Sequence, residues 1–142
     1  MQEKLLKIIA ESKTLEEKLK QISNLIQGKI VFSTSFGIED QVISHAIFSQ
    51  SIKNIEVFTL DTGRLFPETY SVWDKTQLQY NAKIKAYYPN TNTIENYINE
   101  NGINAFYNSV ELRKECCFIR KVEPLNRALV GASIWITGLR AE

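Results

Sequence analysis

One stretch, residues 30–40, constrains the fold of this chain more than any other. It reads Ile-Val-Phe-Ser-Thr-Ser-Phe-Gly-Ile-Glu-Asp: a β-favouring run, then a hydroxyl-rich turn with a single glycine. From residue 41 to residue 50, apolar side chains recur at helical spacing. We therefore expect a strand, a loop and a helix, in that order.

A loop of this kind can bind an anion. It directs backbone N–H groups and the positive end of a helix dipole to one place, where the hydroxyls of Ser33, Thr34 and Ser35 add donors for phosphate or sulfate. The loop lacks the Gly-Lys-Ser/Thr of a Walker A motif and the repeated glycines of a dinucleotide fingerprint. An ordinary turn with Ser35 as helix cap explains the same residues equally well. We expect Glu39 and Asp40 to offset the helix dipole rather than contact an anion.

Length and composition favour one cytosolic domain. The 142 residues are 44% hydrophobic, and their net charge of +1 gives no support to a nucleic-acid or anionic-membrane partner. No run of apolar residues is long enough to span a membrane, and the charged start lacks a signal-peptide core. The two cysteines are neighbours, Cys116 and Cys117, which are too close in the chain for an ordinary disulfide.

Strand and helix patterns alternate along the chain. We expect helices over residues 3–11, 15–27, 93–101 and 110–122, the last interrupted around the cysteines and Pro124, with a further turn or two over 125–130. Another helix opens at Pro67, with Tyr70, Trp73 and Leu78 pointing inward. Strands are expected at the start of the central stretch and over 55–60, 83–88 and 133–137. In the 15–27 helix the buried stripe consists of Leu15, Leu19, Ile22 and Ile26.

This alternation predicts an α/β fold with a parallel sheet and helices on both faces. The usual strand order for such a chain is 3-2-1-4, in which the carboxyl ends of the first and fourth strands flank a ligand-binding crevice. Loops 33–37, 61–64 and 138–140 should then converge.

Several charged residues near these loops are candidates for anion binding. Arg64 and Arg140 qualify, as do Arg120 and Lys121 if their segment folds back towards the loops. We interpret Arg113, Lys114 and Arg127 as solvated surface side chains. Asp61 either binds a ribose hydroxyl or stabilises a turn with Thr62 and Gly63, and the turn is the preferred interpretation. His45 is expected to be packed or hydrogen-bonded rather than a metal ligand.

The cysteine pair admits three interpretations. The thiols are buried small hydrophobes, a vicinal redox pair, or two ligands of a larger metal site. Nearby Arg120 and Lys121 favour thiolates and hence the ligand interpretation, although two sulfurs make only half of a four-thiolate site.

Four motifs together resemble one family. Residues 33–42 (STSFGIEDQV), 60–70 (LDTGRLFPETY), 115–129 (ECCFIRKVEPLNRAL) and 135–140 (WITGLR) are similar to the assimilatory adenylylsulfate and phosphoadenylylsulfate reductases, relatives of the PP-loop ATP pyrophosphatases. The resemblance runs from about Val31 to the end of the chain. It implies a Rossmann-like fold of the adenine nucleotide alpha hydrolase type, incomplete at the C-terminus.

The resemblance also implies an activity, the thioredoxin-dependent reduction of an adenylyl sulfate to sulfite and AMP in the cytoplasm, with thioredoxin or glutaredoxin as the reductant. It assigns Lys121 to a place between an iron–sulfur cluster and the substrate. It assigns substrate binding to Ser33, Ser35, Phe36, Gly37, Leu60, Asp61, Thr62, Gly63, Arg64, Gly138, Leu139 and Arg140. Cys116 and Cys117 match two ligands of a 4Fe-4S cluster, which favours adenylyl sulfate (APS) over the 3′-phosphorylated substrate (PAPS).

The family's nucleophilic cysteine has no counterpart among these 142 residues. We therefore expect a C-terminally truncated chain: a helical lead-in, 1–29, and a partial reductase domain, 30–142, within one structural domain. As isolated it should bind nucleotide weakly, hold no full cluster and show no turnover. No sequence pattern indicates a homo-oligomer, so that question stays open. The alternatives are a PAPS reductase, an ATP-using PP-loop enzyme, whose loop would have a Ser-Gly-Gly pattern, and a noncatalytic adenine-nucleotide-binding module.

Overall fold

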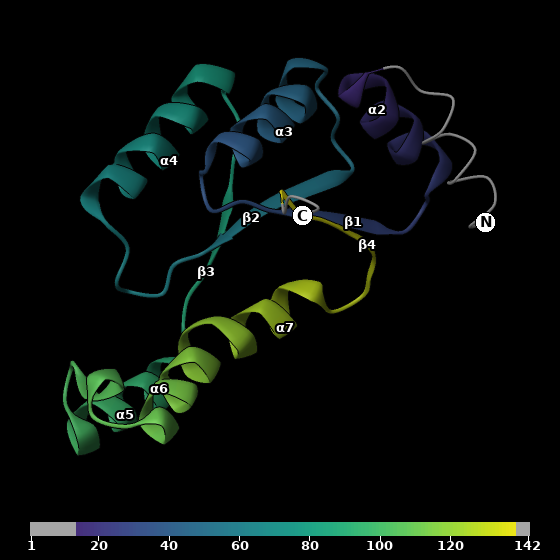
Figure 1. Ribbon diagram of the computed structural model, residues 1–142. Helices are drawn as coiled ribbons and strands as arrows, with labels where there is room; N and C mark the ends of the chain where they lie inside the picture. The colour runs from purple at the N-terminus through teal and green to yellow at the C-terminus, as the bar shows by residue number, and fades with distance from the viewer. Residues whose placement is uncertain (1–13, 139–142) are drawn as a thin grey trace.

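The computed structural model describes residues 14–138 (Figure 1). The helix expected over residues 3–11 and the candidates Leu139 and Arg140 lie outside this range. The strands are β1 (Lys29–Ser33), β2 (Ile55–Leu60), β3 (Lys85–Tyr87) and β4 (Ala132–Ile136). The helices are α2 (Leu15–Leu25), α3 (Ile38–Ser49), α4 (Pro67–Tyr80), α5 (Thr91–Asn101), α6 (Val110–Cys117) and α7 (Glu123–Leu129).

The four strands form one parallel sheet in the order β3-β2-β1-β4, as the sequence predicts. β1 lies inside the sheet and is buried on both faces, which its continuous apolar run explains. Ile30 and Phe32 pack with α2 and α3, whereas Val31 packs with Phe58 and with Ala128 of α7 on the opposite face. Figure 1 shows this layering, with α2, α3 and α4 on one side of the sheet and α7 on the other.

The helices of the first layer follow the sequence prediction except at two α4 positions that were expected to point inward, of which Tyr70 is 39% exposed. Thr14 caps α2 by accepting a hydrogen bond from the Glu17 N–H, and the predicted apolar stripe of this helix packs into the core. The expectation that Leu78 of α4 points inward is wrong, because its side chain is 74% exposed. Thr76 is buried instead: its hydroxyl donates to the Val72 carbonyl and accepts from Gln41 of α3.

The segment after β3 forms a small helical lobe from α5, a 3₁₀ turn (Ala105–Tyr107) and α6. Tyr97, Ala105, Cys116 and Ile119 make its core, separate from the two cores of the sheet. The third strand and the first lobe helix differ from the expected bounds by up to two residues at each end.

The expected interruption around the cysteines is a change of helix type and not a break in the chain's helical path. α6 continues through a π-helical segment, Phe118–Val122, directly into α7. The chain passes through Pro124 without a break, because the proline lies in the first turn of α7, where its missing N–H is tolerated.

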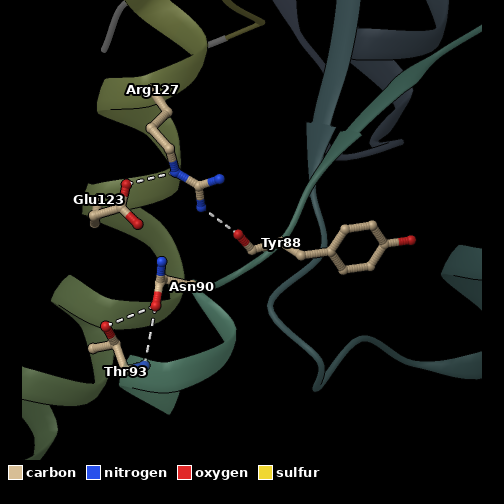
Figure 2. A network of polar contacts seen from close by, with 5 residues as sticks. All are labelled: Tyr88, Asn90, Thr93, Glu123 and Arg127. Carbon is tan, nitrogen blue, oxygen red and sulfur yellow. Dashed lines mark hydrogen bonds and ion pairs between the residues drawn. The ribbon is translucent and has the colours of Figure 1, made fainter. Parts of the chain in front are cut away.

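Arg127 ties α7 to the chain that leaves β3 (Figure 2). Its guanidinium pairs with Glu123 one turn earlier, at 2.6 Å, and donates to the Tyr88 carbonyl. Beside it, Asn90 caps α5 by accepting from the N–H and the hydroxyl of Thr93. The interpretation of Arg127 as a surface side chain is confirmed, since it is 46% exposed, and these contacts hold it in place.

Candidate functional site

A cavity of about 480 Å³ opens at the carboxyl ends of β1, β2 and β4. Its walls come from the loop after β1, the turn after β2, the π segment and the end of β4. The lining residues are Ser33, Thr34, Ser35, Gly37, Glu39, Asp40, Thr59, Leu60, Thr62, Leu65, Thr69, Lys121, Leu125, Trp135, Thr137 and Gly138. The predicted convergence of loops 33–37 and 61–64 with the exit of β4 at Gly138 is thus observed for the described residues.

Asp40 organises the loop after β1. Its carboxylate accepts from the Ser35 N–H at 2.9 Å and from the Ser35 hydroxyl at 2.8 Å. Asp40 does lie in the first turn of α3, as expected, but it also contacts the candidate anion loop, which the dipole argument did not foresee. Ser35 is not the helix cap, because Gly37 occupies that position without a side-chain bond.

Phe36 takes the left-handed backbone conformation, with φ of 64°. This conformation is unusual for a residue that is not glycine. Its N–H donates to the Thr34 hydroxyl, and its ring stacks on Trp73 of α4 at 5.8 Å between centroids. The side chain is directed to α4 and does not line the cavity.

The end of β4 closes the cavity beside this loop. The indole N–H of Trp135 donates to the Ser33 hydroxyl at 2.9 Å, so β4 and the anion loop are tied together. Gly138 passes so close to Asp40 that a Cβ at this position would lie 2.2 Å from a carboxylate oxygen. Only glycine allows this approach without a displacement.

The turn after β2 is held by Asp61. The buried carboxylate accepts from the Gly63 N–H and from the Tyr70 hydroxyl, each at 2.9 Å, which agrees with the preferred turn interpretation. Gly63 has φ of 81°, a conformation that suits glycine. Burial and the Asp61 contact raise the pKa of Tyr70 above its ordinary value of 10.0.

Arg64 does not line the cavity. Its guanidinium donates to the Ile103 carbonyl and the Asn104 side chain, both at 3.1 Å, and lies over the Phe106 ring. The residue therefore links the turn after β2 to the helical lobe.

The π segment brings two basic residues to the site. Among residues 14–138, Lys121 is the one basic side chain that lines the cavity. Arg120 is buried and donates to the Thr62 carbonyl, while its Nε has no hydrogen-bond partner among residues 14–138. The π segment thus folds back on the turn after β2. The sequence analysis counted Arg120 and Lys121 as anion-binding candidates on this condition.

Cys116 and Cys117 end α6, one turn before Lys121. Both are free thiols, Cys116 buried in the lobe core and Cys117 exposed. Nowhere in the described part of the chain do three or more His, Cys, Asp or Glu side chains gather as a metal site. The two adjacent thiols are of the donor type that iron–sulfur clusters require, and they are two of the four that such a cluster takes.

Of the predicted site residues within the described range, the structure gathers seven around the cavity, namely Ser33, Ser35, Gly37, Leu60, Thr62, Lys121 and Gly138. Four other predicted residues do not line the cavity but belong to the loops that form it, namely Phe36, Asp61, Gly63 and Arg64. Sequence reasoning missed six lining residues, although Trp135 stands in the expected fourth strand: Thr59, Leu65, Thr69, Leu125, Trp135 and Thr137. His45 hydrogen-bonds to Tyr80 outside the cavity, as expected. No helix within residues 14–138 has the length and apolarity needed to cross a bilayer.

Curated relatives resemble this chain closely over part of their length. The "Adenosine 5'-phosphosulfate reductase" of Sinorhizobium fredii (strain USDA 257) is 50% identical over 139 residues, which is 92% of this chain and 55% of that protein. Those of Rhizobium meliloti and Allochromatium vinosum are 53% and 44% identical, covering 92% and 89% of this chain, and 48% of each relative. The chain thus spans about half the length of the curated relatives it matches.

The fold also has a counterpart among solved structures. A phosphoadenylyl-sulfate reductase from Candida auris, in a phosphate complex, matches with a TM-score of 0.78 at 24% identity, over 99% of this chain and 67% of that one. This match confirms the α/β fold. Residues 29–142 match the phosphoadenosine phosphosulfate reductase domain, and the chain therefore belongs to this family.

Proposed function

We propose that the cavity binds adenylyl sulfate and that the complete site reduces it to sulfite and AMP. The observation that carries the proposal is the convergence of the hydroxyl-rich loop, the turn after β2 and Lys121 on one cavity at the carboxyl ends of the strands. The relatives at 44–53% identity are named adenosine 5'-phosphosulfate reductases, which supports the same substrate.

The chemistry explains why these groups stand together. Transfer of the sulfonyl group from phosphosulfate to a thiolate breaks the S–O bond and leaves negative charge on the departing phosphate. The Lys121 ammonium and the N–H groups of the first turn of α3 would stabilise this charge more in the transition state than in the bound substrate. Asp40 keeps Ser35 in place beside them.

Cys116 and Cys117 would supply two of the four thiolate ligands of a 4Fe-4S cluster, which would constrain the end of α6 near the substrate when bound. The 142 residues contain no third cysteine, so the attacking thiolate has to come from outside them. A dithiol protein, thioredoxin or glutaredoxin, would then reduce the enzyme thiosulfonate and release sulfite. Free adjacent thiols are compatible with a cytoplasmic protein.

Calorimetric titration of the 142-residue chain tests the binding step. We expect adenylyl sulfate to bind and Lys121→Met to weaken binding by about tenfold, the equivalent of ~1.4 kcal/mol. Arg113→Met, which removes an exposed cation on α6, is the matched control and should leave binding unchanged. Absence of any heat with the wild-type chain would contradict the proposal.

Substrate choice and the missing thiolate call for separate measurements. Parallel titrations with 3′-phosphoadenylyl sulfate should give weaker binding than adenylyl sulfate. The isolated chain with thioredoxin should release no sulfite. Sulfite release would show that one of the two cysteines is the nucleophile and would overturn their assignment as ligands.

A further inference from the structure

Two aromatic contacts and one hydrogen bond connect the two loops of the proposed site through α4. Phe36, in the anion loop, stacks on Trp73 at 5.8 Å and 22° between ring planes. Trp73 in turn stacks on Tyr70 at 6.3 Å and 18°. The Tyr70 hydroxyl donates to Asp61, which fixes the turn after β2. A continuous line of contacts therefore runs from the loop after β1 to the turn after β2 without passing through the sheet.

Each end of this line holds a constrained piece of backbone. Phe36 has φ of 64°, a conformation that persists in a residue with a side chain only when its surroundings hold it. At the other end, Asp61 holds the N–H of Gly63, whose φ is 81°. The aromatic line is thus attached at one end to a strained residue of the anion loop and at the other end to the carboxylate that fixes the turn after β2.

The middle of the line is anchored as well. The Trp73 indole N–H donates to the Gln77 side chain at 3.2 Å, and the same Gln77 oxygen accepts from the Ile84 N–H before β3. Thr76 is the one buried residue of α4, and Trp73 packs, partly buried, against the core beneath the helix.

We propose that Tyr70 and Trp73 are positioning residues that set the spacing between the anion loop and the Asp61–Arg64 turn for a ligand that contacts both. This inference rests on the proposed function, because adenylyl sulfate is the ligand that would span the two loops. Neither side chain lines the cavity, so they act through Phe36 and Asp61 and not by touching the ligand.

The first test removes one hydroxyl from α4. Tyr70→Phe keeps the stack on Trp73 and loses only the bond to Asp61. We expect its dissociation constant for adenylyl sulfate, measured by calorimetry on the full 142-residue chain, to rise about tenfold. Tyr80→Phe is the matched control: it removes a hydroxyl from the same helix that contacts His45 outside the cavity, and binding should not change.

A double-mutant cycle separates positioning from general stability. Phe36→Leu and Tyr70→Phe break the same line at opposite ends, so the double variant should lose little more affinity than the worse single variant. Independent sites would instead give additive losses. Trp73→Phe, which keeps a stacking ring, should bind better than Trp73→Leu, and thermal midpoints report whether each variant is folded.

The outcomes are distinct. Unchanged affinity in Tyr70→Phe, additive losses in the cycle, or an equal loss in Tyr80→Phe would overturn the positioning role while leaving the proposed function intact. If Phe36→Leu does not fold, the comparison of the two Trp73 variants decides. Failure of the wild-type chain to bind adenylyl sulfate would instead overturn the proposed function, and the positioning role with it.

Discussion

At the level of single residues, Asp40 is the part of the site that local sequence rules described least well. Acidic residues in the first turn of a helix ordinarily stabilise it through the helix dipole, and this rule placed Asp40 correctly on α3. The rule says nothing about side-chain direction. Asp40 turns back onto Ser35, five residues earlier, because the left-handed conformation of Phe36 reverses the chain between them.

Gly138→Ala should weaken adenylyl sulfate binding several-fold. The new methyl group would displace the Asp40 carboxylate, which leaves the Ser35 N–H and hydroxyl without their acceptor. Titration calorimetry measures the loss. If the effect passes through Asp40, the double variant Asp40→Ala with Gly138→Ala should bind no more weakly than Asp40→Ala alone.

Tyr97→Phe should make the protein less stable at pH 8, by about 1 kcal/mol, because its buried hydroxyl donates to the Leu112 carbonyl at 2.8 Å. Burial, followed by the nearby Cys116 and Glu115, raises the pKa of Tyr97 above its ordinary value of 10.0. This stabilisation is therefore complete below pH 10.0 and is lost as the pH rises through the higher pKa of the folded state.

Urea unfolding at pH 8 and pH 11 measures this dependence. The difference in unfolding free energy between wild type and Tyr97→Phe should shrink at the higher pH. Tyr107→Phe, at an exposed position of the same lobe, serves as the control and should change stability little. A difference that grows at pH 11 would contradict the assignment.

For the basic residues, position in the sequence did not predict which side chains line the cavity and which only stabilise the fold. Lys121 and Arg64 both follow a site motif, yet only Lys121 lines the cavity, because Arg64 finds acceptors and an aromatic ring in the lobe. Those partners lie about forty residues further along the chain. Local sequence patterns do not predict contacts between residues that are so far apart in the chain.

At the level of elements, the continuous helical path from α6 to α7 differs most from expectation. Pro124 predicts a break, and the cysteines carry no helical signal of their own. The structure instead places the proline in the first turn of α7, and the π segment before it directs Arg120 to Thr62 and Lys121 to the cavity. Sequence reasoning expects an interruption here. The irregular π segment that the structure has instead places the two basic residues at the site.

Arg127→Met should lower the unfolding free energy by about 1 kcal/mol, because it removes both the pair with Glu123 and the bond to the Tyr88 carbonyl. Chemical denaturation followed by circular dichroism provides the measurement. Arg113→Met, an exposed arginine on α6, should cost less than half as much. Equal losses in the two variants would show that the contacts of Figure 2 do not fix α7.

At the level of the whole molecule, the sheet order was the most predictable feature. Alternating strand and helix patterns leave few topologies for a parallel sheet, and the fully apolar Ile30-Val31-Phe32 run marks an interior strand. The way in which the helical lobe packs against the loops of the sheet could not be predicted from the sequence. It depends on single contacts such as Arg64 with Asn104 and Arg120 with Thr62.

Because cavity residues come from both the sheet and the π segment, a bound ligand should hold the two parts together. In a Cys117→Ser variant, the buried Cys116 reports on opening of the lobe through its rate of reaction with a thiol reagent. Saturating adenylyl sulfate should slow this reaction several-fold. The exposed Cys117 in a Cys116→Ser variant should react quickly from the start, and an unchanged Cys116 rate would contradict the coupling.

β4 forms one margin of the four-stranded sheet, with Trp135 nearly half exposed beside it. Main-chain groups along the outer side of such a strand can serve as a template for strands of other molecules. Concentrated solutions of this chain should therefore tend to aggregate through β4. A lysine introduced on that margin, away from Trp135, offers a direct way to keep the protein monodisperse for crystallisation or NMR.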